Sequence, residues 1–184
     1  MNDDGIAETR RYRLGLPAIL GLWTVAPWLR PSITLAHTTT RGDMDIKRNG
    51  SQASNKGPAD WFTGNVYIDT VAVPSAPSRV MANIVHFMPG ARTAWHRHPL
   101  GQSLFVTEGI GLVQHRGGPV ETVRPGDRIY IEPDEEHWHG ATPTRLMVHL
   151  ALNEADDSHV AAHWGDHVTD DEYNAADNRT HQQG

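Results

Sequence analysis

The sequence predicts an all-β fold, a jelly-roll barrel of two facing antiparallel sheets, with an extended N-terminal arm and a short C-terminal helix. From Trp61 onward, short runs rich in Val, Ile, Tyr and Phe are separated by turn clusters at strand-and-turn intervals. Gly117, Gly118 and Pro119 form the clearest hairpin turn between two such runs. Two His-x-His motifs, each on a strand-like stretch, complete the pattern, and no heptad run competes with it.

The composition fits one domain plus tails, because the chain has 184 residues, of which 38% are apolar. We expect the barrel domain at 44–153, an extension at 1–43 and a tail at 154–184. The net charge of −6 comes from scattered acidic residues, which argues against a nucleic-acid partner. The absence of cysteine excludes disulfides and thiolate ligands.

Residues 1–43 differ from the rest and are expected to be disordered. The apolar run at 14–29 is interrupted by two prolines and is too short to span a membrane, so no membrane partner is expected. The favoured interpretation is an extension upstream of a start at Met44, because signal peptides usually lack an acidic leader; the protein is then cytoplasmic. The alternative is a signal peptide at 1–36, which would export the protein.

Polar and small residues at 44–60 predict an extended arm. Arms of this kind often reach a neighbouring subunit, and we expect a homo-oligomer, either a dimer or a tetramer. The arm is followed by strands expected at residues 64–68, 79–87, 93–98, 102–108, 111–116, 120–123, 128–131, 137–140 and 144–152.

The tail contains two further patterns. Thr169 and Glu172 have the spacing of a capping box, which predicts a short helix ending near Ala176. A spacing typical of one helical face, although interrupted by a glycine, is found at His159, His163 and His167. These three histidines are a weaker candidate for a second metal site.

The first His-x-His motif directs two imidazoles to one point. Side chains alternate between the faces of a strand, so His96 and His98 point the same way. A turn then leads into a strand that begins at Gln102, which can place a carboxamide oxygen beside them. His137 and His139 repeat the alternation farther along the chain. Two imidazoles, an amide oxygen and a third imidazole suit a divalent ion such as Mn²⁺, Fe²⁺ or Ni²⁺, with open coordination positions.

The first of these stretches resembles the first signature motif of the cupin superfamily, whose fold is a jelly-roll barrel, or double-stranded β-helix. Gly90, His96, His98 and Gly109 hold the motif positions. Gln102 stands where glutamate is usual.

The second stretch resembles the second cupin motif in its ligand register, through Gly126 and His137. The usual proline, glycine and asparagine of that motif are replaced by Glu132, Asp134 and Ala141. The resemblance selects His137 as the fourth ligand and leaves His139 facing the same cavity. The implied metal shell is therefore His96, His98, Gln102 and His137.

A narrower resemblance covers residues 44–153. The stretches 56–64, 89–102 and 137–144 are similar to small single-domain bacterial cupins that act as manganese-dependent hydroxynitrile lyases. This resemblance implies a small-molecule substrate and Mn²⁺ as the cofactor, with Fe²⁺, Ni²⁺ and Zn²⁺ as alternatives.

Strand alternation also assigns candidate residues to the cavity. On the strand before the first motif, Asn83 and Val85 share the inward face. On the last strand, Met147, His149 and Asn153 oppose a leucine and valine face, which is expected to pack between elements. We expect Asn83, Val85, Met147 and Asn153 to line a substrate pocket and His149 to orient a neighbouring group.

The donor set points to a class of chemistry. Gln102 in place of glutamate leaves four neutral ligands, which favours a Lewis acid over a redox centre. The resemblance to hydroxynitrile lyases implies reversible cleavage of a cyanohydrin to an aldehyde or ketone and hydrogen cyanide, and we expect His139 as the base and His149 as a second catalytic histidine. Two alternatives stay open, an iron-dependent dioxygenase that uses O2 and a non-catalytic cupin that binds a small molecule.

Overall fold

The computed structural model describes residues 44–174 of the chain. The predictions for residues 1–43, and for the end of the C-terminal helix near Ala176, lie outside the described residues. Contacts divide the chain into Met1–Asp45 and Ile46–Gly184, and the second unit contains all the strands given below.

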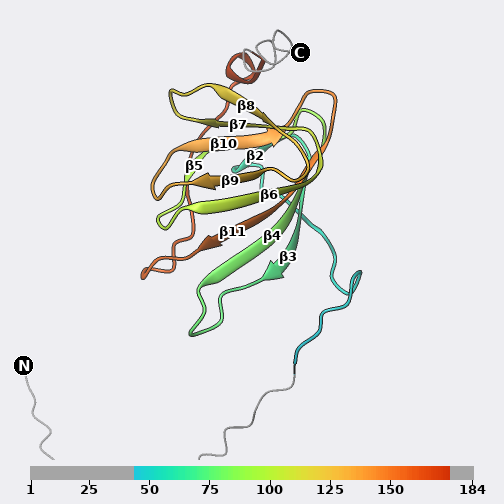
Figure 1. Ribbon diagram of the computed structural model, residues 1–184, viewed down its shortest axis with the longest axis vertical. Helices are drawn as coiled ribbons and strands as arrows, with labels where there is room; N and C mark the ends of the chain where they lie inside the picture. Colours follow the sequence, from blue (N-terminus) through green and yellow to red (C-terminus); the bar gives the residue numbers. More distant parts are fainter. Residues whose placement is uncertain (1–43, 175–184) are drawn as a thin grey trace, which may run out of the picture. The chain divides into compact units, whose positions relative to one another are not determined.

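Two antiparallel sheets form the barrel (Figure 1). The first sheet has the order β1 (Asn55–Lys56), β3 (Val66–Ala72), β4 (Val80–Phe87), β11 (Met147–Glu154), β6 (Gln102–Gly109) and β9 (Arg128–Ile131). The second has the order β12 (His163–His167), β5 (Arg92–Arg97), β10 (His137–Ala141), β7 (Gly111–His115) and β8 (Val120–Val123), with β2 (Phe62–Thr63) also paired to β5. Neighbours in each sheet are mostly distant in sequence, as in a jelly roll, and the predicted fold class is confirmed.

All nine expected strands are present, with ends that shift by a few residues. Three further strands were not expected. β1 and β2 have only two residues each, too few to show an alternation in the sequence. β12 overturns the helical interpretation of His163 and His167, because this segment is a strand paired antiparallel with β5.

The space between the sheets is filled by inward-facing apolar side chains. On β4, Val85 and Phe87 point inward, and Val106 of β6 and Met147 of β11 meet them. Each of these side chains is at most 7% exposed, so the closed end of the barrel is a packed core. The five imidazoles described below lie in the remaining part of the interior.

A second apolar cluster forms where the C-terminal segment meets the second sheet. The helix begins at Asp170, and Thr169 and Glu172 make the predicted capping box: Glu172 N donates to Thr169 Oγ1 over 3.2 Å, and Thr169 N donates to Glu172 Oε2 over 2.8 Å. Tyr173 packs beside Trp138, and its hydroxyl donates to Ala141 O over 2.6 Å. The helix is thereby attached to β10, the strand that carries two of the imidazoles. In the described part of the chain, no helix is both long and apolar enough to cross a membrane.

Candidate metal centre

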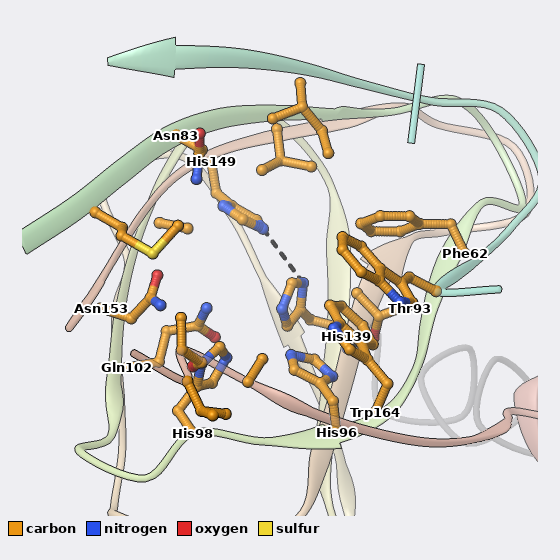
Figure 2. A pocket seen from close by; sticks show the side chains of 18 of the residues that line it. Phe62, Asn83, Thr93, His96, His98, Gln102, His139, His149, Asn153 and Trp164 are labelled. Atoms are coloured by element: carbon orange, nitrogen blue, oxygen red, sulfur yellow. Dashed lines mark hydrogen bonds between the residues drawn. The ribbon is translucent and has the colours of Figure 1, made fainter. Parts of the chain in front are cut away.

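Strand register brings the two His-x-His motifs together. β5 and β10 are neighbours in the second sheet, and His96 and His137 are direct cross-strand partners. The alternation of each strand then points His98 and His139 inward as well. His149 enters from β11 of the facing sheet, beside His139 (Figure 2). All five rings are buried, with 4% exposure or less.

Gln102 reaches the same point because the chain turns sharply after β5. Gly101 has a φ of 78°, which glycine adopts without strain, and its amide donates to His98 O over 3.2 Å. A Cβ at Gly101 would lie 2.7 Å from Ile131 O, so this close turn also requires the absence of a side chain. The Gln102 Oε1 atom consequently lies 3.3 Å from His137 Nε2.

Three of the imidazoles have the same hydrogen-bonding pattern. In each, Nδ1 contacts a backbone carbonyl, which can only accept, so the proton lies on Nδ1 and Nε2 carries a lone pair toward the interior. The contacts are His96 with Ala94 O at 3.0 Å, His98 with Ala161 O at 2.6 Å and His137 with Glu135 O at 2.9 Å. Hydrogen bonds of this kind fix the tautomer of metal-binding histidines.

Burial keeps these rings neutral. Desolvation lowers the pKa of His137 to about 4 and that of His149 to about 3. Desolvation, reinforced by neighbouring imidazoles, lowers the pKa of His96 and of His139 well below the usual value, and desolvation lowers that of His98. Neutral imidazole is the form that ligates metals.

These donors fit a divalent cation on two grounds. His137 Nε2 and Gln102 Oε1 are both acceptors, yet they face each other at 3.3 Å, an arrangement that a cation between them would make favourable. The Nε2 atoms of His98 and His139 are buried without a hydrogen-bond partner, and a ligated cation would compensate the cost of burying either.

The tightest group of ligand atoms belongs to His96, His137 and His139, which lie within 4.8 Å of one another. By ring centroids, His98 lies as near to these rings as His139 does: 5.1 Å from His96 and 5.7 Å from His137, compared with 5.3 and 5.8 Å for His139. The structure thus brings all four predicted ligands to one place and adds His139 to them. Two overlapping ligand sets are available, and both contain His96 and His137.

His139 differs from the other imidazoles in its partner. Its Nδ1 lies 3.2 Å from His149 Nε2 (dashed line in Figure 2), and Phe87 packs against both rings at centroid distances of 5.6 and 5.5 Å. The opposite nitrogen of His139, Nε2, faces the interior without a partner. A neutral ring held in this way can accept a proton from a bound molecule when Nε2 carries the lone pair.

A cavity of about 460 Å³ adjoins the imidazoles, a size suited to a small molecule. Figure 2 shows carboxamides on one side of His139, among them Asn83 and Asn153, and Phe62 and Trp164 on the other. Val85 also lines the cavity, and none of the lining residues is an aspartate, glutamate, lysine or arginine.

Met147 does not lie where the sequence predicted. It is 1% exposed and packs in the core, where its side chain fills the space that a Cβ on Gly111 would occupy. Face alternation assigns a residue to a side of the sheet but not to a depth in the barrel.

The sequence interpretation also missed part of the cavity wall. Trp61, Phe62 and Trp164 line it, together with residues 159–162 from the tail. The adjacent aromatic pair directly after the arm was a usable signal, since ligand cavities are lined mainly by hydrophobic and aromatic side chains.

The fold and the imidazole cluster are those of a cupin. The cupin domain model matches residues 83–151, from β4 to β11. The chain belongs to the cupin family.

Within the family, the chain is 56% identical to the (R)-mandelonitrile lyase of Granulicella tundricola over 130 residues, which cover 71% of this chain and 98% of that protein. It is 40% identical to a cupin-like protein of known structure from Thermotoga maritima, with a TM-score of 0.63 and coverage of 72% of this chain and 97% of that one. A cupin-2 domain protein from Rhodospirillum rubrum, at 16% identity, shares the fold with a TM-score of 0.53, over 72% of this chain and 84% of that one.

Proposed function

We propose that this protein is a metal-dependent hydroxynitrile lyase that cleaves a cyanohydrin reversibly to an aldehyde or ketone and hydrogen cyanide. The observation that carries the proposal is the unpartnered Nε2 of buried, neutral His139, which faces the cavity directly beside the candidate metal donors. The 56% identity to an (R)-mandelonitrile lyase supports the same reaction class.

The proposed ligands are His96, His98, Gln102 and His137, with Mn²⁺ as the expected ion. The shared hydrogen-bonding pattern of the three imidazoles supports this set, because each has its Nδ1 on a backbone carbonyl, which leaves Nε2 free to bind an ion. His139 has a different partner, which supports a separate role. When bound, the ion would supply positive charge that stabilises the negative charge developing on the substrate oxygen or on the departing cyanide.

The residues of the chain would carry the proton. Nε2 of His139 accepts the proton of the cyanohydrin hydroxyl as the bond from carbon to cyanide breaks and the electron pair leaves with cyanide. The carbinol carbon becomes the carbonyl carbon, and the proton passes from His139 to cyanide to give hydrogen cyanide. His149, whose Nε2 atom lies 3.2 Å from Nδ1 of His139, orients the His139 ring for this transfer.

The walls of the cavity would select and hold the substrate. Phe62 and Trp164 offer an apolar surface for a hydrocarbon substituent, and the buried position of the imidazoles limits the access of water to the base. Asn83 and Asn153 are proposed contacts for polar atoms of the substrate at the opposite side.

Elemental analysis of the purified protein, followed by assays of mandelonitrile cleavage with the Mn²⁺-loaded and chelator-treated protein, tests the proposal. We expect one divalent ion per chain and cleavage that is lost on chelation and restored by Mn²⁺. Metal binding without cleavage would favour a binding cupin, and O2 consumption by the iron-loaded protein would favour a dioxygenase. A cytoplasmic location and a homo-oligomer remain separate expectations.

A further inference from the structure

The chain lines the cavity again after it leaves β11. We call residues 155–164 the strap; it follows β11 and includes the first two residues of β12, which pairs with β5. Residues 159–162 and Trp164 of the strap line the cavity. The strap therefore forms a wall of the cavity and pairs with the strand that carries the first His-x-His motif.

One contact joins the strap to His98. The His98 Nδ1 atom donates to Ala161 O over 2.6 Å, across 63 residues of sequence. The equivalent bonds of His96 and His137 go to carbonyls only two residues away, on their own stretches of chain. His98 is thus the one of these three imidazoles whose tautomer depends on a distant segment.

A second contact joins the strap to His96. The Trp164 indole stacks on the His96 imidazole with a centroid distance of 4.6 Å and an interplanar angle of 19°. The Trp61 indole also stacks on Trp164, at 5.0 Å and 3°. Rings from Trp61, β12 and β5 therefore pack in contact, which restricts rotation of the His96 ring about its χ2 angle.

The strap is held in shape by its own hydrogen bonds. Asp156 Oδ1 accepts the amides of Ser158 at 2.9 Å and Val160 at 2.8 Å, and Asp156 N donates to Val160 O over 2.9 Å. His159 accommodates the turn with a φ of 63°, a conformation that is uncommon for residues other than glycine. Ala161 follows directly after this turn, so the turn presets the position of the Ala161 carbonyl.

We infer that the strap is a positioning element of the metal centre, in which Ala161 O holds the tautomer of His98 and Trp164 holds the ring orientation of His96. Both imidazoles then present Nε2 lone pairs to one point before an ion arrives. Such preorganisation raises metal affinity because the ordering of the ligands is already complete. The inference rests on the proposed metal centre but not on the proposed lyase reaction.

The test uses the full chain and four variants. Trp164→Ala removes the stacked ring, Trp164→Phe restores an aromatic ring, and Asp156→Ala loosens the turn that carries Ala161. His163→Ala is the matched control, because it alters an exposed residue beside Trp164 on the same strand. Two quantities are measured for each: the Kd for Mn²⁺ by chelator competition, and the imidazole 15N chemical shifts of the metal-free protein, which report the tautomer of each histidine.

We expect Trp164→Ala and Asp156→Ala to raise the Kd about tenfold to a hundredfold, the usual cost of losing a group that orients a ligand. The 15N shifts of His98 should show mixed tautomers in Asp156→Ala, whereas His163→Ala should match the wild type and Trp164→Phe should recover most of the affinity. A Kd within twofold of wild type in both Trp164→Ala and Asp156→Ala, with unchanged 15N shifts, would overturn the inference. If the wild-type protein bound no divalent ion, the proposed function would fail instead, and the 15N shifts alone would decide whether the strap holds the imidazoles.

Discussion

The Nδ1 atom of His139 lies 3.2 Å from the Nε2 atom of His149, and this is the one hydrogen-bond contact of the His139 ring within the described residues. Only one proton can lie between the two nitrogens. If His139 donates it, the His139 Nε2 atom carries a lone pair and can act as a base; if His149 donates it, Nε2 is protonated and cannot. The proposed reaction therefore requires His139 to be the donor.

This requirement leads to an expectation for His149. His149→Ala should retain bound metal but lose about tenfold to a hundredfold in kcat for cyanohydrin cleavage, because His139 no longer has a fixed tautomer. His149→Gln can offer an amide oxygen to the His139 N–H and should recover part of the rate. The comparison of kcat and metal content decides the point: a wild-type rate in His149→Ala would show that no acceptor is needed at this position.

His137 and His139 are neighbours on one strand, with ring centroids 5.8 Å apart, but their proposed roles differ. His137→Ala should lose both metal and activity, because its Nε2 lies at the Gln102 oxygen. His139→Ala should keep its metal and lose about a hundredfold or more in rate, the usual scale for a general base.

Metal content by elemental analysis and cleavage rates, measured on the same preparations, separate these two roles. Since His139 also belongs to the tightest group of candidate ligand atoms, an empty site in His139→Ala and a filled one in His137→Ala would exchange the assignments. Full activity in both variants would exclude the proposed chemistry.

The lowered pKa values of the buried rings have a consequence for stability. The pKa of His137 is about 4 and that of His149 about 3 in the folded protein, compared with 6.5 for an exposed imidazole. As the pH falls below 6.5, the unfolded chain binds protons that the folded chain does not, so the free energy of unfolding decreases. Above that pH both states are neutral, and these rings add no pH dependence.

Urea denaturation of the metal-free protein between pH 7.5 and 5 measures this effect. We expect the midpoint to be constant down to about pH 7 and to decrease steadily below pH 6.5. His149→Phe is the control, because it removes one titrating ring and fills the same space, so its decrease should be smaller. A midpoint independent of pH over this range would show that folding does not lower the pKa values of these rings.

The site residues on strands were predictable because side-chain alternation is a local property. The inward direction of each candidate histidine follows from the alternation of its own strand, without knowledge of the partner strands. This holds for His96, His98, His137, His139 and His149. Met147 points to the same face of β11 as His149, yet it lies in the core and not at the cavity. The depth of Met147 in the barrel is determined by its packing against Gly111 on another strand. The sequence of β11 alone carries no information about that contact.

The strap and β12 were not predictable for a related reason. The segment His163–His167 has no apolar alternation, and a glycine lies at its centre, so its strand form depends on pairing with the edge of β5. The contact of Ala161 O with His98 is likewise a backbone contact, which side-chain identity does not encode. Contacts between distant segments, rather than local patterns, complete the candidate site.

Gln102 provides the sharpest test of the proposed charge of the site. It occupies the position where the first cupin motif usually has glutamate, it is 6% exposed, and no charged side chain lines the cavity that it faces. Gln102→Glu changes almost nothing in shape but places a carboxylate next to the His137 Nε2 atom. Without metal, this buried charge has no cationic partner among the lining residues, so the metal-free variant should be less stable than the wild type.

With metal, the expected effects of Gln102→Glu are opposite for binding and for catalysis. The carboxylate attracts the ion, so the Kd for Mn²⁺ should fall about tenfold or more, while the reduced net positive charge should lower kcat for cyanohydrin cleavage about tenfold. Asn83→Asp, which adds a carboxylate to the same cavity on a different strand, controls for charge without ligation and should not tighten Mn²⁺ binding to the same extent. Tighter binding with an undiminished kcat would show that the neutral donor set is not needed for the reaction, and unchanged binding would remove Gln102 from the metal shell.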